Sequence, residues 1–411
     1  MTELWSPPPR SEAAVNLYEL AEADRAAHPE RYRLDLERLA SGVIERAGRA
    51  PDSEEWRDGL GRYLTSAQHD GRLNAVGVKM AAATAKGRLA ARVKMDELLA
   101  ERPEIASRVI DRPIVIIGGW RTGTTLLQRM MAAIPALRAT YPAELSAPWS
   151  APHPSEADRW ERFIDQRDAQ AALDALNPAL AEVHPFGNRE AEECVLAMGT
   201  DGLNWGFPST IRLDSYADWL TSQDFTGSYE RYADVLRVLQ GDVSTRWVLK
   251  APAHTAELAA LLCAFPDACV VHLHRDVVAT ITSGCSLFAV FRSTYSDAVD
   301  PVQLGEYQLD TTATWFERSM EARDELPPQH PSTIVDLDFR ELVSAPAATV
   351  KRLAERFDVA LAPDVDERLA ARLEHLDRQH GAHRYAPEQF GLDADRITER
   401  LSDYRTRFGL T

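Results

Sequence analysis

The sequence has few cysteines, and their placement excludes a disulfide scaffold. Only four occur among 411 residues, and no two of them form a C-x-x-C pair. Single cysteines in mostly apolar surroundings are typical of buried thiols in a reducing compartment. We therefore expect free, structural thiols at Cys194, Cys263, Cys269 and Cys285.

The sequence also lacks an apolar leader and an excess of basic residues. The opening MTELWSPPPR has no signal core, and no stretch approaches the length that spans a bilayer, so we expect a cytoplasmic protein without a transmembrane segment. The formal net charge of −17 excludes a general nucleic-acid binder, because phosphate backbones require a basic face. An anionic ligand must therefore meet a local cluster of Arg and Lys.

The composition is otherwise that of a globular protein, with 45% hydrophobic and 27% charged residues. Residues 11–110 are rich in Ala, Leu, Glu and Arg and are interrupted by prolines, which indicates several helices. We predict two parts, a helical N-terminal segment (1–110) and an α/β domain (111–411). The N-terminal segment is expected to pack on the domain or on a second copy in a homo-oligomer.

One stretch, IVIIGGWRTGTTLLQRMM at residues 114–131, organises the rest. The four branched residues at 114–117 are typical of a strand that is buried on both faces, and two glycines end the run. After Gly123 the apolar positions take helical spacing, with Thr124 and Thr125 where N-caps would lie. A strand, a glycine loop and a helix start together direct several backbone N–H groups at one anion.

The spacing from Gly118 to Thr125 matches the phosphate-loop pattern G-x-x-x-x-G-K-[ST] except that Thr124 replaces the lysine. That lysine normally reaches the β- and γ-phosphates of a nucleotide. Arg121, inside the loop, supplies a guanidinium fork that suits a different phosphate ester. An ordinary βα turn, with glycines for close packing, is the alternative interpretation.

Two later strands end in basic residues. WVLK ends in Lys250, and ACVVHLH is followed directly by Arg275, with a helical pattern between the two strands. Alternating strands and helices predict a parallel sheet with right-handed crossovers, whose ligands bind at the carboxyl edge of the strands. We therefore expect a three-layer α/β fold of phosphate-loop type, with Lys250, Arg275 and the glycine loop at one edge.

These residues are similar to those of the sulfotransferases that use 3′-phosphoadenosine 5′-phosphosulfate (PAPS), especially the bacterial branch related to tyrosylprotein sulfotransferases. The resemblance runs from about Pro113 to the C-terminus. It implies that the first loop binds the 5′-phosphosulfate, with Thr122 in place of the usual serine. The loop residues concerned are Gly119, Trp120, Arg121, Thr122, Gly123, Thr124 and Thr125.

The same resemblance implies the other donor contacts. Arg275 and Ser283, eight positions apart in RDVVATITS, match the pair that binds the 3′-phosphate. Lys250 matches the lysine that contacts the oxygens of the transferring group. The basic residues His383 and Arg384 match loosely a C-terminal segment that closes over the adenosine.

The catalytic base has three candidates. Glu144 in YPAEL has the position of the glutamate base of the tyrosylprotein branch, and it is preferred here. His254 lies four residues beyond Lys250, whereas the cytosolic branch has a histidine two residues beyond its lysine. His184 is the third candidate, since reach decides a proton acceptor as much as pKa does.

The resemblance predicts an enzyme that moves a sulfuryl group from PAPS to a hydroxyl of a small, fairly apolar acceptor, by in-line transfer and without a metal. Arg121 and Lys250 would neutralise charge, which leaves no role for magnesium. His272 and His274 alternate on a strand, but two ligands without a third do not make a metal site. The aromatic residues Trp205, Phe207, Tyr216 and Trp219 either line the acceptor cavity or pack in the core.

Two other functions fit the loop. A kinase or other phosphotransferase would use the same strand, loop and helix, although the missing lysine opposes it. A non-catalytic nucleotide-binding protein would use the helical N-terminus and the acidic surface for a partner. The sequence does not separate a phenol, a sterol, a lipid and a carbohydrate as acceptor.

Overall fold

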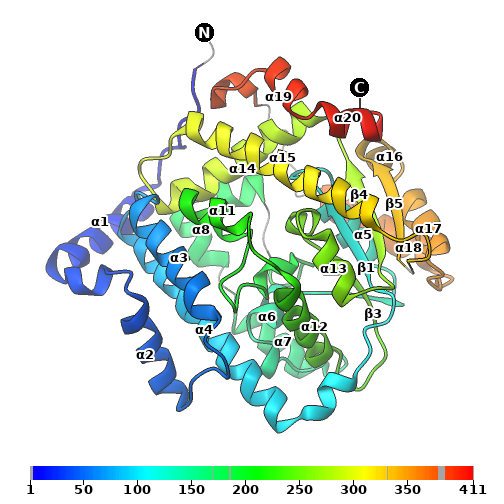
Figure 1. Ribbon diagram of the computed structural model, residues 1–411, viewed down its shortest axis with the longest axis horizontal. Helices are drawn as coiled ribbons and strands as arrows, with labels where there is room; N and C mark the ends of the chain where they lie inside the picture. Colours follow the sequence, from blue (N-terminus) through cyan, green and yellow to red (C-terminus); the bar gives the residue numbers. More distant parts are fainter. Residues whose placement is uncertain (1–2, 169, 185–186, 331, 378–384, 411) are drawn as a thin grey trace.

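The computed structural model describes residues 3–168, 170–184, 187–330, 332–377 and 385–410. The chain forms a five-stranded sheet in the order β2-β3-β1-β4-β5, in which every pair of neighbours is parallel. Its labelled strands lie in the right half of Figure 1. The strands are β1 (Ile114–Gly118), β2 (Leu137–Ala139), β3 (Arg246–Lys250), β4 (Cys269–His274) and β5 (Thr333–Asp338). The predicted parallel α/β fold is confirmed.

The central strand β1 is buried along its whole length, as its branched apolar run predicts. Its side chains alternate between the two faces of the sheet. Ile114 and Ile116 join a core cluster with α5 (Thr124–Met131), α17 (Pro346–Arg356) and α18 (Val365–Asp377). Val115 and Ile117 join the larger cluster on the opposite face. The sheet is therefore the middle of three layers.

Four helices pack in the larger cluster and cover the other face of the sheet. α12 (Thr226–Gln240), α13 (Leu258–Ala264), α14 (Val277–Tyr295) and α15 (Pro301–Glu325) all contribute to the larger cluster. Residues 291–330 are largely helical, since they include the end of α14 and all of α15. The other short helices are α6 (Pro142–Ser146), α10 (Phe207–Thr210), α11 (Asp214–Leu220), α16 (Phe339–Ser344), α19 (Ala394–Arg400) and α20 (Ser402–Phe408).

The region from about 155 to 183 contains three short helices. They are α7 (Ala157–Asp165), α8 (Gln170–Leu176) and α9 (Ala179–Val183). Single 3-10 turns join several elements, at Pro29–Tyr32, Pro103–Ser107, Pro148–Ser150, Cys194–Leu196, Pro252–Thr255 and Pro387–Phe390.

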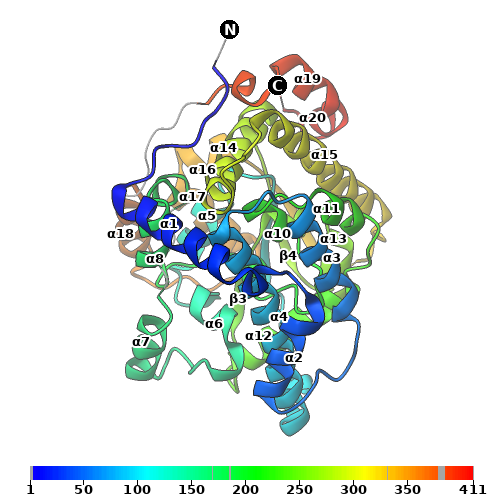
Figure 2. The same cartoon turned by 90° about the vertical axis from the view of Figure 1, so that its left-hand side faces the viewer.

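The N-terminal helices pack on the α/β layers. They are α1 (Glu12–Ala27), α2 (Leu36–Ala47), α3 (Trp56–His69) and α4 (Ala75–Glu101), drawn in blue to cyan (Figures 1 and 2). Tyr63 and Leu64 of α3 belong to the same apolar cluster as Val115 of the central strand. The predicted division at 110/111 thus separates two stretches of sequence that contribute to one core.

One helix corrects the expectation that no stretch could span a bilayer. Val277–Tyr295 is long and apolar enough by length and composition, with a mean hydropathy of 1.3. Within the molecule, however, 78% of the apolar part of this helix is buried. The apolar composition is explained by packing against α4 and α15 inside the core.

The close contact between α4 and α14 gives a test of this packing. A Cβ added at Gly77 would lie 2.1 Å from the carbonyl oxygen of Tyr295, so we expect Gly77→Ala to lower the free energy of unfolding by about 1–3 kcal/mol. Gly87 lies on the same helix with no heavy atom within 4 Å of its added Cβ. Gly87→Ala should raise stability by up to about 1 kcal/mol. Urea unfolding of both variants checks this, and equal effects would contradict the packing.

Candidate active site

The loop between β1 and α5 has an unusual backbone. Gly118, Arg121 and Gly123 all have positive φ, at 144°, 61° and 92°. For Arg121 this left-handed conformation costs free energy, which a binding loop typically retains for function. α5 begins directly after Gly123 without a side-chain cap, so its first N–H groups face the loop. The loop therefore has the backbone that an anion site requires.

Arg275, which follows β4, reaches the same loop. Its Nη1 donates a hydrogen bond to the carbonyl oxygen of Arg121 over 2.7 Å, and its guanidinium lies 4.4 Å from the ring centre of Phe339. Burial lowers the pKa of both arginines, and for Arg275 the nearby Arg121 lowers it further. In the described part of the chain neither guanidinium has an ion-pair partner within 4 Å. Two adjacent, partly desolvated cations favour a bound anion.

The remaining residues that the sequence predicted for donor binding have different positions. Ser283 lies on α14 and is half-buried, two turns after β4 ends. The hydroxyl of Thr122 donates to the carbonyl of Gly119 over 2.8 Å, which stabilises the loop itself. His383 and Arg384 lie outside the described residues.

Lys250 ends β3 and is completely buried. Its Nζ lies 2.9 Å from Oε1 of Glu193 and 3.7 Å from Oε1 of Glu192. Burial alone would raise the pKa of Glu192, but its interactions, first with His184 and then with Lys250, hold it well below its usual value. Glu192 is therefore ionised at neutral pH.

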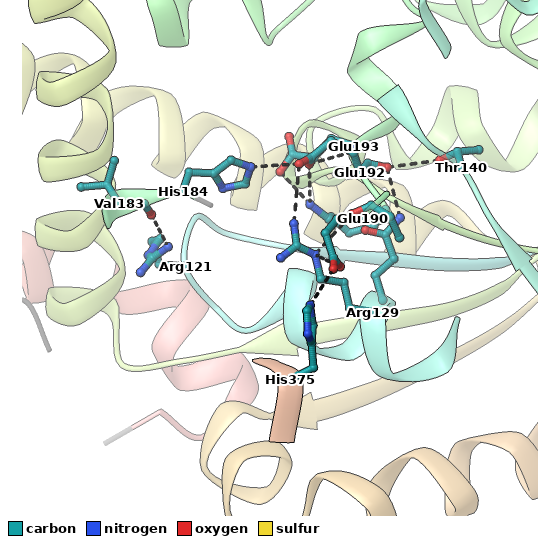
Figure 3. Close-up of polar contacts among 12 residues, drawn as sticks. Arg121, Arg129, Thr140, Val183, His184, Glu190, Glu192, Glu193 and His375 are labelled. Atoms are coloured by element: carbon teal, nitrogen blue, oxygen red, sulfur yellow. Dashed lines mark hydrogen bonds and ion pairs between the residues drawn. The ribbon is translucent and has the colours of Figure 1, made fainter. Parts of the chain in front are cut away.

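His184 contacts this ion-pair group. Its Nε2 lies 3.1 Å from Oε2 of Glu192 (Figure 3). Arg121 donates to the carbonyl oxygen of Val183 over 2.9 Å, directly beside His184 in the chain. The glycine loop, His184 and the partners of Lys250 thus form one continuous polar group.

A cavity of about 260 Å³ opens beside this group. Trp120 of the glycine loop lines it, together with His184, Glu192 and Glu193. The rest of the wall is mostly apolar and comes from several helices, with Tyr63, Met80, Thr84, Arg88, Leu173, Leu180, Val195, Leu196, Asn204, Gly206, Phe207, Ser209, Thr210, Leu287, Phe291 and Tyr295. The cavity has the character of a site for an apolar small molecule.

The structure does not bring Glu144 to this cavity. Glu144 is fully buried, and both of its carboxylate oxygens are used locally. Oε2 pairs with Arg138 over 2.8 Å, and Oε1 accepts the backbone N–H of Tyr141 over 3.0 Å. Desolvation by burial raises the pKa of Glu144. The residue caps α6 and balances Arg138.

His254 is also absent from the cavity wall. It is fully buried, and its Nδ1 lies 2.7 Å from the hydroxyl oxygen of Tyr229. Burial, and then Lys250, lower the pKa of His254 to about 3. The imidazole is therefore neutral and enclosed in the protein interior.

The predicted aromatic region serves both purposes that the sequence left open. Phe207 lines the cavity, whereas Trp205 and Tyr216 are packed in the core. Trp205 donates to Glu257 over 2.9 Å, and burial raises the pKa of that carboxyl to about 7.

His272 and His274 have a third potential ligand that the sequence did not show. Nε2 of His274 lies 2.9 Å from Oδ1 of Asp336, and the ligating atoms of all three lie within 4.8 Å of one another. Arg323 donates to both oxygens of Asp336, over 2.7 and 2.9 Å. A metal ion there would lie against a guanidinium, so the group is better suited to its present ion pairs.

The sequence also matches a known family. Residues 113–363 match the model of the sulfotransferase family, which includes the glycine loop, Lys250 and Arg275. The chain belongs to the sulfotransferase family. The predicted family and the predicted enzyme class are thereby confirmed.

Relatives of this sulfotransferase are bacterial. An omega-hydroxy-beta-dihydromenaquinone-9 sulfotransferase, Stf3, of Mycobacterium bovis is 24% identical over 323 residues, which cover 74% of this chain and 77% of the relative. Stf3 of Mycobacterium tuberculosis matches to the same extent.

Solved structures agree with the fold. Sulfotransferase STF1 of Mycobacterium tuberculosis is 27% identical with a TM-score of 0.77, over 90% of this chain and 98% of that one. Sulfotransferase STF9 of Mycobacterium avium is 22% identical with a TM-score of 0.80, over 91% and 97% of the two chains. Since about a tenth of this chain is left uncovered, the matched fold includes at least part of the N-terminal helical segment.

Proposed function

We propose that this sulfotransferase takes its sulfuryl group from PAPS and transfers it to a hydroxyl of a small, apolar acceptor in the cavity. The contact of Arg275 with the loop at Arg121 carries this proposal, because it places two cations at one end of the sheet beside the cavity. A doubly phosphorylated adenosine has two anionic ends, which such a pair of sites can bind. Release of adenosine 3′,5′-bisphosphate from sulfur-labelled PAPS, with label appearing in an alcohol, phenol or lipid, tests the proposal.

The roles of the donor residues follow from their positions. The loop amides and Arg121 would hold the 5′-phosphosulfate, and Arg275 with Ser283 would hold the 3′-phosphate. Trp120 lies in both the loop and the cavity wall, so the sulfuryl group would face the acceptor directly. Positioning and electrostatic stabilisation then supply most of the catalysis.

In the transfer, the acceptor oxygen forms a bond to sulfur while the bond from sulfur to the bridging phosphate oxygen breaks. The electron pair of the broken bond remains on the phosphate, where Lys250 would stabilise the developing charge. The proton of the acceptor hydroxyl passes to a base. The products are a sulfate ester and adenosine 3′,5′-bisphosphate.

We assign the proton to His184 rather than to Glu144. His184 lines the cavity, and Glu192 lies within hydrogen-bond distance of its Nε2. With Nε2–H donating to the carboxylate, the tautomer carries its lone pair on Nδ1. An ionised Glu192 would also stabilise the imidazolium that forms, as the carboxylate does in other His–carboxylate pairs.

Two matched substitutions test this assignment. His184→Asn should lower kcat by about a hundredfold or more, with unchanged binding of adenosine 3′,5′-bisphosphate, because the base is lost while the donor site stays intact. Glu144→Gln should keep kcat within a few-fold and lower the free energy of unfolding by about 1–3 kcal/mol. Steady-state kinetics and calorimetry measure both. The opposite pattern would return the base to Glu144.

The acceptor class is supported by the cavity and by a relative. The Stf3 relatives are named for a hydroxylated menaquinone derivative, which is an apolar molecule with a hydroxyl group. The apolar wall fits such chemistry. We also propose a cytoplasmic location, which fits the free thiols at the four cysteines.

A further inference from the structure

The helix α4 brings a cation into the wall of the acceptor cavity. Arg88 lines the cavity, and its Nη1 donates to the carbonyl oxygen of Leu196. Its guanidinium also lies 5.9 Å from the ring centre of Phe207. Among the described residues, no carboxylate lies within 4 Å of this guanidinium. A guanidinium has five N–H donors, so one carbonyl leaves most of its capacity unused.

Hydroxyl groups surround Arg88 in this part of the wall. Tyr63 of α3 interacts with Thr84 and lies near both Arg88 and Tyr295. Burial raises the pKa of Tyr63 and raises that of Tyr295 to about 12, so both phenols are neutral at pH 7. Burial lowers the pKa of Arg88 to about 10, which leaves it protonated. The net charge of this group is therefore that of Arg88 alone.

The acidic residues of the same cavity are already compensated. Glu193 pairs with Lys250, and Glu192 pairs with His184. These contacts adjoin the glycine loop, whereas Arg88 comes from the N-terminal helices, which lie to the left of α5 in Figure 1. A desolvated cation without a counterion is unfavourable, and a ligand that supplies the counterion removes that cost.

We propose that the acceptor carries a carboxylate in addition to its reacting hydroxyl, and that Arg88 binds that carboxylate. The proposal rests on the proposed function, because it takes this cavity as the acceptor site. A guanidinium fork matches a carboxylate in a bidentate manner, and the hydroxyls of Tyr63, Thr84 and Tyr295 can donate to the same oxygens. The modest volume and apolar remainder of the cavity favour a short hydroxylated acid.

The test compares acids with alcohols of the same length. Two pairs serve as probes: 10-hydroxydecanoate with 1,10-decanediol, and 3-(4-hydroxyphenyl)propanoate with 3-(4-hydroxyphenyl)propan-1-ol. Calorimetry in the presence of adenosine 3′,5′-bisphosphate should show that the wild-type protein binds at least one acid about tenfold more tightly than its alcohol. Arg88→Gln should remove that preference, because it lowers the affinity for the acid far more than the affinity for the alcohol.

Further variants separate this binding role from a structural one. Arg88→Lys keeps the charge and should retain part of the preference. Lys86→Gln removes a charge from the same helix at a residue outside the cavity wall, and it should retain the full preference. Equal binding of acid and alcohol by the wild-type protein, or binding of neither, would overturn the proposal. The readout needs no sulfuryl transfer, so failure of the donor assignment would be seen separately, as absent turnover with the acid preference intact.

Discussion

Lys250→Met is expected to lower kcat by about 100- to 1000-fold while adenosine 3′,5′-bisphosphate still binds. The size of the effect follows from the loss of a buried cation where negative charge develops in the transition state. Lys250 is completely buried at the end of β3, where water cannot replace it. Single-turnover kinetics with PAPS, together with calorimetry of the product, measure both quantities.

The same substitution also leaves Glu193 and Glu192 without their common partner, so stability should fall as well. The double variant Lys250→Met/Glu193→Gln removes charge from both sides of the pair. It should recover part of the lost free energy of unfolding without recovering turnover. A single variant with kcat within tenfold of the wild-type value would show that Lys250 has no part in the transfer.

Arg275→Ala should weaken the binding of adenosine 3′,5′-bisphosphate by about tenfold to hundredfold. A charged hydrogen bond contributes about 1.5–3 kcal/mol, and each 1.4 kcal/mol is about tenfold in affinity. Arg275→Lys keeps the charge but not the planar fork, so an intermediate affinity is expected. Calorimetry measures all three proteins.

A surface arginine provides the control for this measurement. Arg368 on α18 pairs with Asp364 over 2.9 Å, and both side chains are largely exposed. Arg368→Ala changes the net charge by the same amount as Arg275→Ala and should leave the affinity unchanged. Equal losses in the two variants would indicate a general effect of charge, and unchanged affinity in Arg275→Ala would refute the 3′-phosphate assignment.

The elements around the glycine loop could be predicted from sequence because their signals are local. The branched run before Gly118 specifies a buried strand, and the two glycines specify the turn that follows it. The parallel order of strands then requires Lys250 and Arg275 to lie at the same edge as the loop. The hydrogen bond from Arg275 to the carbonyl oxygen of Arg121 agrees with this expectation.

The cavity wall could not be predicted in the same way, because its residues meet only through packing between distant segments. Glu192 and Glu193 had no motif, and their significance comes from Lys250, more than fifty residues later. Arg88 lies in a helical segment where arginine is usually a solvated surface residue. Each needed the packed arrangement of helices before its role could be seen.

The preference for Glu144 illustrates a related limit. Its position after the first helix matched a catalytic glutamate, but Arg138 and the N–H of Tyr141 use both of its oxygens. A tyrosine and proline followed by glutamate at the third helical position is compatible with a capping box, and this local signal was present in YPAEL. A structural carboxylate and a catalytic one can therefore share the same spacing.

The contribution of α3 and α4 to the cavity wall has a consequence for acceptor binding. Tyr63, Met80, Thr84 and Arg88 all precede residue 113, where the match to the family model begins. The rest of the cavity wall lies within the matched stretch, so the cavity is encoded partly inside and partly outside the region that the family shares. Under the proposed function, substitutions at these four positions would change which acceptor binds, while the glycine loop, Lys250 and Arg275 stay unchanged.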